Sequence, residues 1–190
     1  MRKITADKIY TISHDVLENQ VIVLEEDGTI AAIEPIEQHD STSIERFKGI
    51  LVPGFINAHC HLELSHMKGR VPTGTGLIPF IKNVVQFRAD YSPEQIQAAI
   101  AQADTDMKTA GIVAVGDISN TTDTIPTKTK SDIHYHTFVE MFDFMVDDSA
   151  QERFDEYKSV ADQYQQQSLP YTLVPHAPYS TSQRLFELIQ

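Results

Sequence analysis

Beyond residue 50, short apolar runs of strand type alternate with longer segments whose apolar residues recur at helical spacing. The strand-type runs begin near Ile50 and then cover residues 112–118, 136–142 and 171–177. Strands that alternate with helices through short links predict a parallel sheet with right-handed crossovers. We count four strand-helix units, half of a closed eight-stranded barrel. Such a half leaves two sheet edges and one apolar face uncovered.

The helix that follows residue 92 has the clearest predicted boundaries. Ser92 suits the N-cap, Pro93 the first helical position and Gln95 the reciprocal bond of a capping box, and Gly111 can end the helix. Further helices are expected around residues 80–85 and 154–164, and a last one opens at residues 180–183, where "STSQ" reads as another capping box.

The first fifty residues have a different pattern. Short runs of strand type are found at residues 8–12, 21–24 and 29–33. Asp27-Gly28 favours a hairpin between the last two runs, and the polar residues 37–47 predict a connection. We therefore predict a small β-module over residues 1–49 and a second domain over residues 50–190.

Charge and composition restrict the class of partner. Lysine and arginine number 15 and aspartate and glutamate 27, so the net charge is −12, which argues against nucleic acid or an anionic membrane. No apolar signal-peptide core opens the chain, and no apolar run is long enough for a membrane span. The single cysteine, Cys60, fits a reducing cytoplasm. We expect a cytoplasmic protein that binds a small molecule.

The stretch "PGFINAHCHLELS", residues 53–65, contains the strongest chemical signal. Side chains alternate along a strand, so His59 and His61 should point to one side and Cys60 to the other. Two neutral imidazoles on one rigid strand suit zinc or iron, which makes His59 and His61 candidate metal ligands. The alternative for any such pair is a packing role in the core.

A second His-x-His, formed by His134 and His136, is an internal comparison. It opens its predicted strand, whereas His59 and His61 close theirs. Active sites of α/β barrels gather at the carboxyl ends of the strands. We therefore expect His134 and His136 to be structural or exposed to solvent.

Several segments together resemble one enzyme family. The segments are "LVPGFINAHCHLELS", "GTGLIPFIKNVVQFR", "AVGDIS", "FVEMF" and "LVPHAPYS". They resemble the N-terminal half of the metal-dependent amidohydrolase superfamily, in the branch of cytosine deaminases, chlorohydrolases and adenosine-type deaminases. "HLELS" and "GTGL" look most like deaminases of aminodeoxyfutalosine or similar nucleosides. The resemblance implies the first half of a TIM-type (β/α)8 barrel, preceded by a small β-sandwich that includes C-terminal strands.

The resemblance also implies roles for individual residues. His59 and His61 match metal ligands, and His176 matches a histidine that contacts the substrate. One divalent ion is implied, zinc with iron as the alternative, and residues 171–180 lack the lysine that a two-metal site commonly uses. The remaining metal ligands, a proton-shuttling glutamate and an aspartate would lie beyond Gln190.

Two further residues are candidates for contact with substrate. Glu63 shares the strand parity of His59 and His61, although a solvated loop carboxylate explains it as well. Arg88 could pair with a substrate carboxylate, with a surface arginine as the alternative. We expect Asp117 and Glu140 to form hydrogen bonds in the barrel interior, without a catalytic role.

The family reaction implies attack of metal-bound hydroxide on a carbon that bears an amino or other leaving group. This predicts a hydrolase of a carbon-nitrogen bond other than a peptide bond, specifically a deaminase of a nucleoside or nucleobase-like substrate. We expect the isolated chain to be inactive and to associate with itself or with a complementary C-terminal half. The alternative is a non-catalytic half-barrel or a partner-binding domain.

Overall fold

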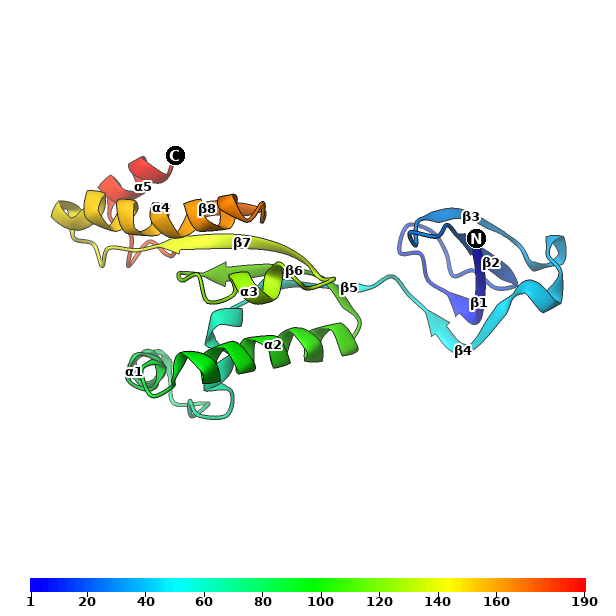
Figure 1. The fold of residues 1–190 in the computed structure, drawn as a ribbon, viewed down its shortest axis with the longest axis horizontal. Helices are drawn as coiled ribbons and strands as arrows, with labels where there is room; N and C mark the ends of the chain where they lie inside the picture. The colour runs from blue at the N-terminus through cyan, green and yellow to red at the C-terminus, as the bar shows by residue number, and fades with distance from the viewer. The chain divides into compact units, whose positions relative to one another are not determined.

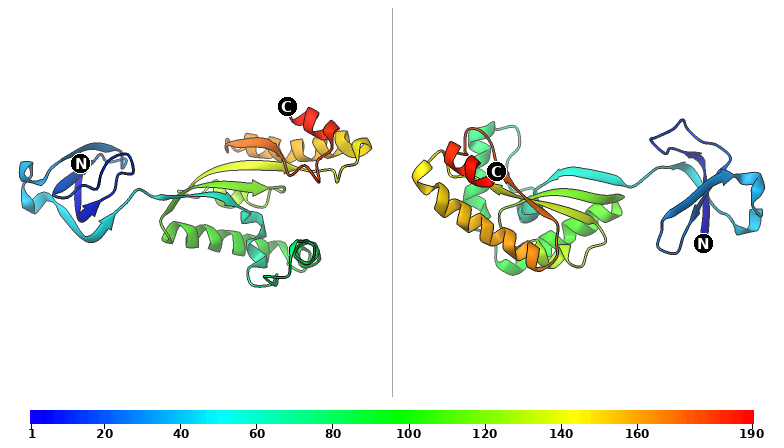
Figure 2. Two further views of the ribbon diagram at one scale, coloured as in Figure 1. Left: turned by 180° about the vertical axis from the view of Figure 1, so that it is seen from behind. Right: turned by 90° about the horizontal axis from the view of Figure 1, so that it is seen from above.

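The computed structural model describes all 190 residues, which form two compact units, Met1–Gly54 and Phe55–Gln190. Figures 1 and 2 show a small β-unit and a larger unit of mixed helices and strands. The division falls after Gly54 instead of after residue 49, because strand β4 (Glu45–Leu51) pairs with the first strand of the chain. None of the helices combines the length and apolar character that a membrane span requires.

The first unit is a single four-stranded sheet in the order β3-β2-β1-β4. Its other strands are β1 (Arg2–Ile9), β2 (Gln20–Leu24) and β3 (Ile30–Pro35), and two short 3-10 turns, η1 (Ile36–Gln38) and η2 (Ser41–Ser43), follow. Val21, Val23 and Ile44 form its buried core. The prediction that residues 37–47 are only a connection was wrong at its end, since β4 begins at Glu45 and runs parallel to β1.

The second unit confirms the predicted alternation of strands and helices. Its sheet has the order β5-β6-β7-β8, and all three neighbouring pairs are parallel. The strands are β5 (Phe55–Cys60), β6 (Ile112–Ser119), β7 (His134–Met141) and β8 (Tyr171–Pro175). The helices are α1 (Leu77–Arg88), α2 (Pro93–Thr109), α3 (Ile125–Lys128), α4 (Ala150–Gln166) and α5 (Gln183–Ile189), with 3-10 segments η3 (Leu62–Met67) and η4 (Asp147–Ser149). Eight-stranded closure stays a prediction.

The helix boundaries follow local chemistry. Ser92 caps α2: its hydroxyl accepts a hydrogen bond from the Gln95 amide, and its backbone amide donates the reciprocal bond of the capping box to Gln95 Oε1. Gly111 follows the end of α2 with a φ of +82°, a left-handed conformation that glycine adopts without strain. The prediction of a capping box that begins at Ser180 was wrong. Ser182 is the N-cap of α5, and its hydroxyl accepts a hydrogen bond from the Leu185 amide.

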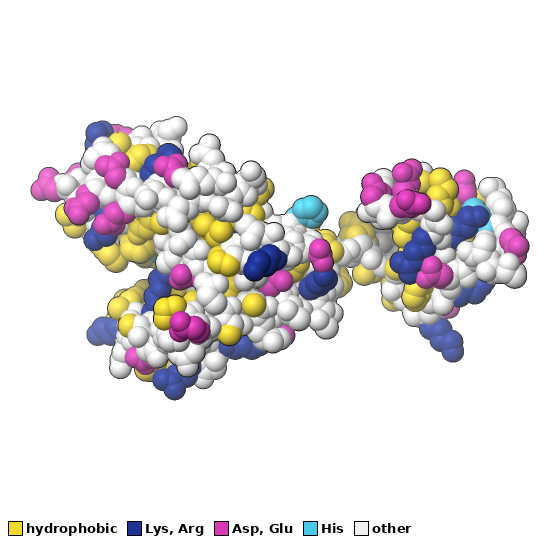
Figure 3. Space-filling view, viewed as in Figure 1, with side chains coloured by type: hydrophobic (Ala, Val, Ile, Leu, Met, Phe, Trp, Pro, Cys, Tyr) yellow, Lys and Arg dark blue, Asp and Glu magenta, His cyan; other side chains and the backbone are white.

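One face of the sheet is covered by helices. α2 packs over β5 and β6 through a core that contains Ile100 and Val115, and α4 packs over β7 through Val139 and Tyr164. Figure 1 shows α3 between these two helices. Along β7 the residues toward the helices are buried and those between them are more exposed. Figure 3 shows acidic side chains over α4 and α5 with lysine and arginine side chains among them, and ion pairs such as Arg153–Glu156 and Arg184–Glu187 lie on these helices.

Candidate active site

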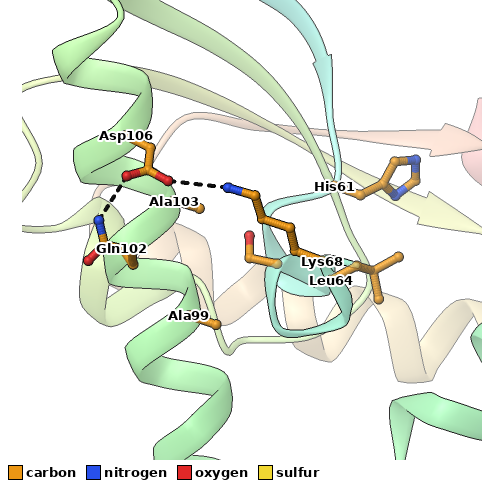
Figure 4. Close-up of a pocket in the computed structure, with 8 residues that line it drawn as sticks. His61, Leu64, Lys68, Ala99, Gln102, Ala103 and Asp106 are labelled. Carbon is orange, nitrogen blue, oxygen red and sulfur yellow. Dashed lines mark hydrogen bonds and ion pairs between the residues drawn. The ribbon is translucent and has the colours of Figure 1, made fainter. Parts of the chain in front are cut away.

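His59 and His61 lie together at the carboxyl end of β5. Their ring centroids are 5.1 Å apart at an interplanar angle of 63°, and both residues are exposed. Cys60 instead packs against the buried cluster under α2, which contains Leu62 and Ile100. In Figure 4 the His61 ring points away from α2. The two imidazoles and the thiol therefore take opposite sides, as strand alternation predicts.

A bulge in β5 sets this arrangement. Asn57 lies opposite Val115 and Cys60 opposite Asp117, so the step from Asn57 to Cys60 on β5 faces a step of only two residues on β6. Asn57 as well as Cys60 faces α2 in consequence, and the Asn57 amide lies 3.7 Å from the Met107 sulfur. A bulge re-aims the side chains beyond it. Alternation counted from Asn57 would place His59 on the side of α2, because the bulge lies between them. Alternation between the neighbours His59 and Cys60 still gives the observed directions.

A buried ion pair lies behind the end of β5. Lys128 Nζ is 2.6 Å from Asp117 Oδ2, with both side chains 0% exposed, and the Leu62 amide donates to Asp117 Oδ1 at 2.7 Å. Burial raises the pKa of the Asp117 carboxyl and lowers that of Lys128, while each partner opposes the shift of the other. We predicted that Asp117 would form hydrogen bonds in the barrel interior. That prediction was wrong, because the Asp117 side chain lies on the helix-covered face of the sheet. Sequence reasoning missed Lys128 altogether.

Glu63 is a buried anchor. Its side chain is 2% exposed, and Oε2 accepts hydrogen bonds from the Asn120 amide (2.9 Å) and from the amide and hydroxyl of Thr121 (3.0 and 2.9 Å). The Ser119 hydroxyl, at 3.2 Å, is a further donor. These contacts tie η3 to the loop after β6. The sequence suggested Glu63 for substrate contact, and the structure assigns its carboxylate oxygens to the protein instead.

Arg88 occupies the end of α1 and reaches the same carboxylate. Arg88 Nη2 donates to Glu63 Oε1 at 3.0 Å, while 41% of the arginine side chain remains exposed. Its other guanidinium donors can therefore meet an anion from solvent. His66 is buried against Tyr91, with ring centroids 4.9 Å apart. Burial, and then the Arg88 charge, lower the pKa of His66.

His176 directly follows β8, at the same end of the parallel sheet as His59 and His61. Its Nδ1 lies 2.6 Å from Ser180 Oγ and its Nε2 4.0 Å from Glu140 Oε2. β5 and β8 are the two edge strands, so three strand spacings separate them, about 14 Å in a flat sheet. One metal ion cannot bridge that distance with bonds of about 2 Å, whereas a nucleoside-sized molecule can approach both groups.

His134 and His136 open β7, at the opposite end from His59 and His61, and both are exposed. His136 Nε2 is 2.9 Å from Thr172 Oγ1, and the His136 ring packs against Phe138. The structural or solvent-exposed position expected for this pair agrees with these contacts.

The donors present can fill only part of a metal coordination shell. No group of three or more histidine, cysteine, aspartate or glutamate side chains in the chain is arranged to hold a metal ion. His59 and His61 supply two neutral nitrogen donors, and a tetrahedral zinc site requires four ligands in all. A cavity of about 370 Å³ lies between η3 and α2, lined in part by Ala99, Gln102, Ala103 and Asp106. His61 is also among the residues that line this cavity, although its ring points away from α2 (Figure 4).

The fold and these residues define an α/β protein whose parallel sheet presents a histidine pair and a third histidine at the carboxyl ends of its strands. Residues 50–189 match the amidohydrolase family, and the chain belongs to that family. The resemblance stated from the sequence motifs is confirmed.

Similar proteins include several deaminases. An aminodeoxyfutalosine deaminase from a Nitratiruptor species is 31% identical over 99 residues, which are 50% of this chain and 24% of that protein. The structure resembles Helicobacter pylori aminofutalosine deaminase in complex with methylthio-coformycin, with a TM-score of 0.79, 24% identity, and coverage of 100% of this chain and 47% of that one. A zinc-bound adenosine deaminase from Xanthomonas campestris has a TM-score of 0.74 at 20% identity, covering 98% and 45%. This chain spans about half the length of these two structures, and its match to the Nitratiruptor protein covers 24% of that protein.

Proposed function

We propose that this chain supplies part of the active site of a metal-dependent hydrolase that deaminates a nucleoside or nucleobase-like substrate. The observation that carries the proposal is the pair of exposed imidazoles 5.1 Å apart at the carboxyl end of β5. Membership of the amidohydrolase family and the deaminase relatives support it. Zinc in related structures supports a divalent ion, with iron as the alternative.

His59 and His61 would hold the ion through neutral ring nitrogens, on a strand end fixed by the Leu62 and Glu63 contacts. A divalent ion bound there makes water nucleophilic near neutral pH. Hydrolytic deamination replaces a carbon-nitrogen bond with a carbon-oxygen bond and releases ammonia. In this chain His176 would contact the substrate from the opposite edge strand, and Arg88 would pair with an anionic group of the substrate. Glu63 orients Arg88 and does not itself meet the substrate.

We further propose that the remaining metal ligands and the proton-transferring carboxylates come from a complementary segment, in the same polypeptide or in a partner. The edge strands β5 and β8 each lack a neighbour on one side. Phe55 and Ile56 on β5 are 59% and 70% exposed. Covering several hundred Å² of such surface, at about 25 cal/mol per Å², stabilises an association by several kcal/mol before entropic terms. Self-association is the alternative way to cover these edges.

Ammonia release tests the proposal. The 190-residue chain, alone and combined with the C-terminal half of an aminodeoxyfutalosine deaminase, would be supplied with zinc or iron and assayed against aminodeoxyfutalosine, adenosine, guanine and cytosine. We expect turnover only in the combined sample, lost in His59→Ala. The His134→Ala variant is the matched control and should keep the activity. Co-purification of the two halves without turnover would instead favour the non-catalytic, partner-binding function.

A further inference from the structure

The His176 ring is held on several sides. Nδ1 lies 2.6 Å from Ser180 Oγ, and Nε2 lies on the side of Glu140. The rings of Phe142 and Tyr179 lie at centroid distances of 5.8 and 5.7 Å, with interplanar angles of 66° and 86°. The two aromatic contacts limit rotation of the imidazole, so the hydroxyl and the carboxylate face fixed ring nitrogens.

Ser180 is itself fixed in place. It is 6% exposed, and its carbonyl oxygen accepts hydrogen bonds from the amides of Asp143 and Phe144 at 3.1 and 3.0 Å. The Asp143 carboxylate, on a residue 2% exposed, accepts from the Ser182 and Met145 amides at 2.8 and 3.1 Å. Phe144 and Met145 adopt left-handed backbone conformations, with φ of 55° and 65°, which these contacts stabilise. The turn after β7 therefore clamps the turn that carries His176.

The hydrogen bonds around Ser180 determine where the imidazole proton lies. The hydroxyl has one proton, and its candidate acceptors are His176 Nδ1 at 2.6 Å and the Ala177 carbonyl at 3.2 Å. That carbonyl already accepts from the Ser180 and Thr181 amides, both at 3.0 Å. These contacts favour donation of the hydroxyl proton to Nδ1, and with that donation a neutral ring carries its own proton on Nε2. In a protonated ring both nitrogens carry protons, so Nε2 has one in either state.

We propose that Ser180 is a positioning residue that fixes His176 as a hydrogen-bond donor through Nε2, directed to the face of the sheet opposite α4. Glu140 lies on that face, because its neighbours Val139 and Met141 pack under the helices. The 4.0 Å between Nε2 and Glu140 Oε2 is too long for a direct hydrogen bond, which leaves the Nε2 proton for another acceptor. That acceptor would be a ring nitrogen, carbonyl or hydroxyl of the substrate, and this assignment rests on the proposed function. A protonated Nε2 does not ligate a metal ion.

Ring nitrogen chemical shifts test the proposal on the 190-residue chain itself. In a sample labelled with 15N at histidine, at a pH where histidine rings are neutral, Nε2 should carry the proton and Nδ1 should show the shift of a hydrogen-bond acceptor. His134, whose exposed ring makes no hydrogen bond, gives the internal reference for a mixture of tautomers. Ser180→Ala should move His176 to that mixture, and Ser180→Thr should restore the wild-type shifts.

Several results would overturn the proposal. A proton on Nδ1 of the neutral wild-type ring is one, and unchanged shifts in Ser180→Ala are another. Glu140→Gln should leave the tautomer unchanged, so a tautomer that depends on Glu140 and not on Ser180 would also contradict it. If Ser180→Ala fails to fold, the wild-type and Ser180→Thr spectra still decide. The readout needs neither metal nor turnover, so a fixed Nε2 tautomer together with no ammonia release from the combined halves would refute the proposed function alone.

Discussion

Replacing Lys128 by methionine should destabilise the second unit strongly. Methionine preserves most of the side-chain length but removes the cation that faces Asp117. Lys128 Nζ also donates to Thr137 Oγ1 at 2.8 Å and lies 5.0 and 5.4 Å from the ring centroids of Tyr164 and Tyr135. The substitution therefore leaves a buried carboxylate without its cation and with the Leu62 amide as its backbone donor.

The expected loss is about 3–5 kcal/mol at neutral pH, the usual effect of removing one partner of a buried ion pair. Burial already raises the pKa of Asp117, and removing Lys128 raises it further. A carboxyl with a raised folded-state pKa holds a proton that the unfolded chain releases. The loss should therefore be largest near neutral pH and shrink as the pH falls through the folded-state pKa.

Urea unfolding at neutral and mildly acidic pH, followed by tyrosine circular dichroism, measures the loss of unfolding free energy in Lys128→Met and its pH dependence. The double variant Asp117→Asn/Lys128→Met should recover most of the loss, because asparagine keeps an acceptor for the Leu62 amide and carries no charge. Lys158→Met breaks a partly exposed pair with Asp162 on the surface of α4 and should leave the unfolding midpoint unchanged within error. A Lys128→Met variant as stable as the wild type at neutral pH would refute the role assigned to the pair.

Three further outcomes follow from local contacts. Glu63→Gln turns an amide group toward protein donors and should lower the free energy of unfolding by about 2 kcal/mol in a thermal melt. The same substitution at the exposed Glu152 should have no such effect. Equal melting temperatures for the two variants would contradict the anchoring role of Glu63. Burial raises the pKa of Cys60 to about 12, so iodoacetamide at pH 8 should label it far more slowly in the folded than in the urea-unfolded chain, and equal rates would show an accessible thiolate. Ser92→Ala removes the hydroxyl that accepts the Gln95 amide, while the bond from the residue 92 backbone amide to Gln95 Oε1 can still form. It should destabilise the protein by about 1 kcal/mol, with Ser92→Thr close to wild type in the same urea assay.

The parts of the fold that the sequence predicted are those with strong local signals. The α2 boundaries depend on Ser92, Gln95 and Gly111, all of which act within a few residues of the helix ends. β4 was partly missed because six of its seven residues are exposed and carry no alternating apolar pattern. Its pairing with β1 comes from backbone contacts between segments about forty residues apart, which no local pattern encodes.

The candidate site divides in the same way. The opposite directions of His59 and Cys60 follow from strand alternation, and the position of His176 follows from the shared end of parallel strands. The partners of Glu63 and Asp117 could not be predicted, because these partners lie in elements distant in sequence: Asn120 after β6 for Glu63, and Lys128 in α3 for Asp117. A lysine in a four-residue helix usually signals a solvated turn, and only the packing of α3 against β6 shows Lys128 to be buried.

Zinc titration of the 190-residue chain, followed by the ring resonances of its eight histidines, tests the central claim most directly. The two His-x-His pairs compete within one molecule. His59 and His61 should respond together at the lower zinc concentration, because their rings already lie together, whereas binding through His136 Nε2 would break its Thr172 contact. His59→Ala should abolish the response of His61 and leave His134 and His136 unchanged. A first response at His134 and His136, or a His61 response that survives His59→Ala, would contradict the assignment of the metal site.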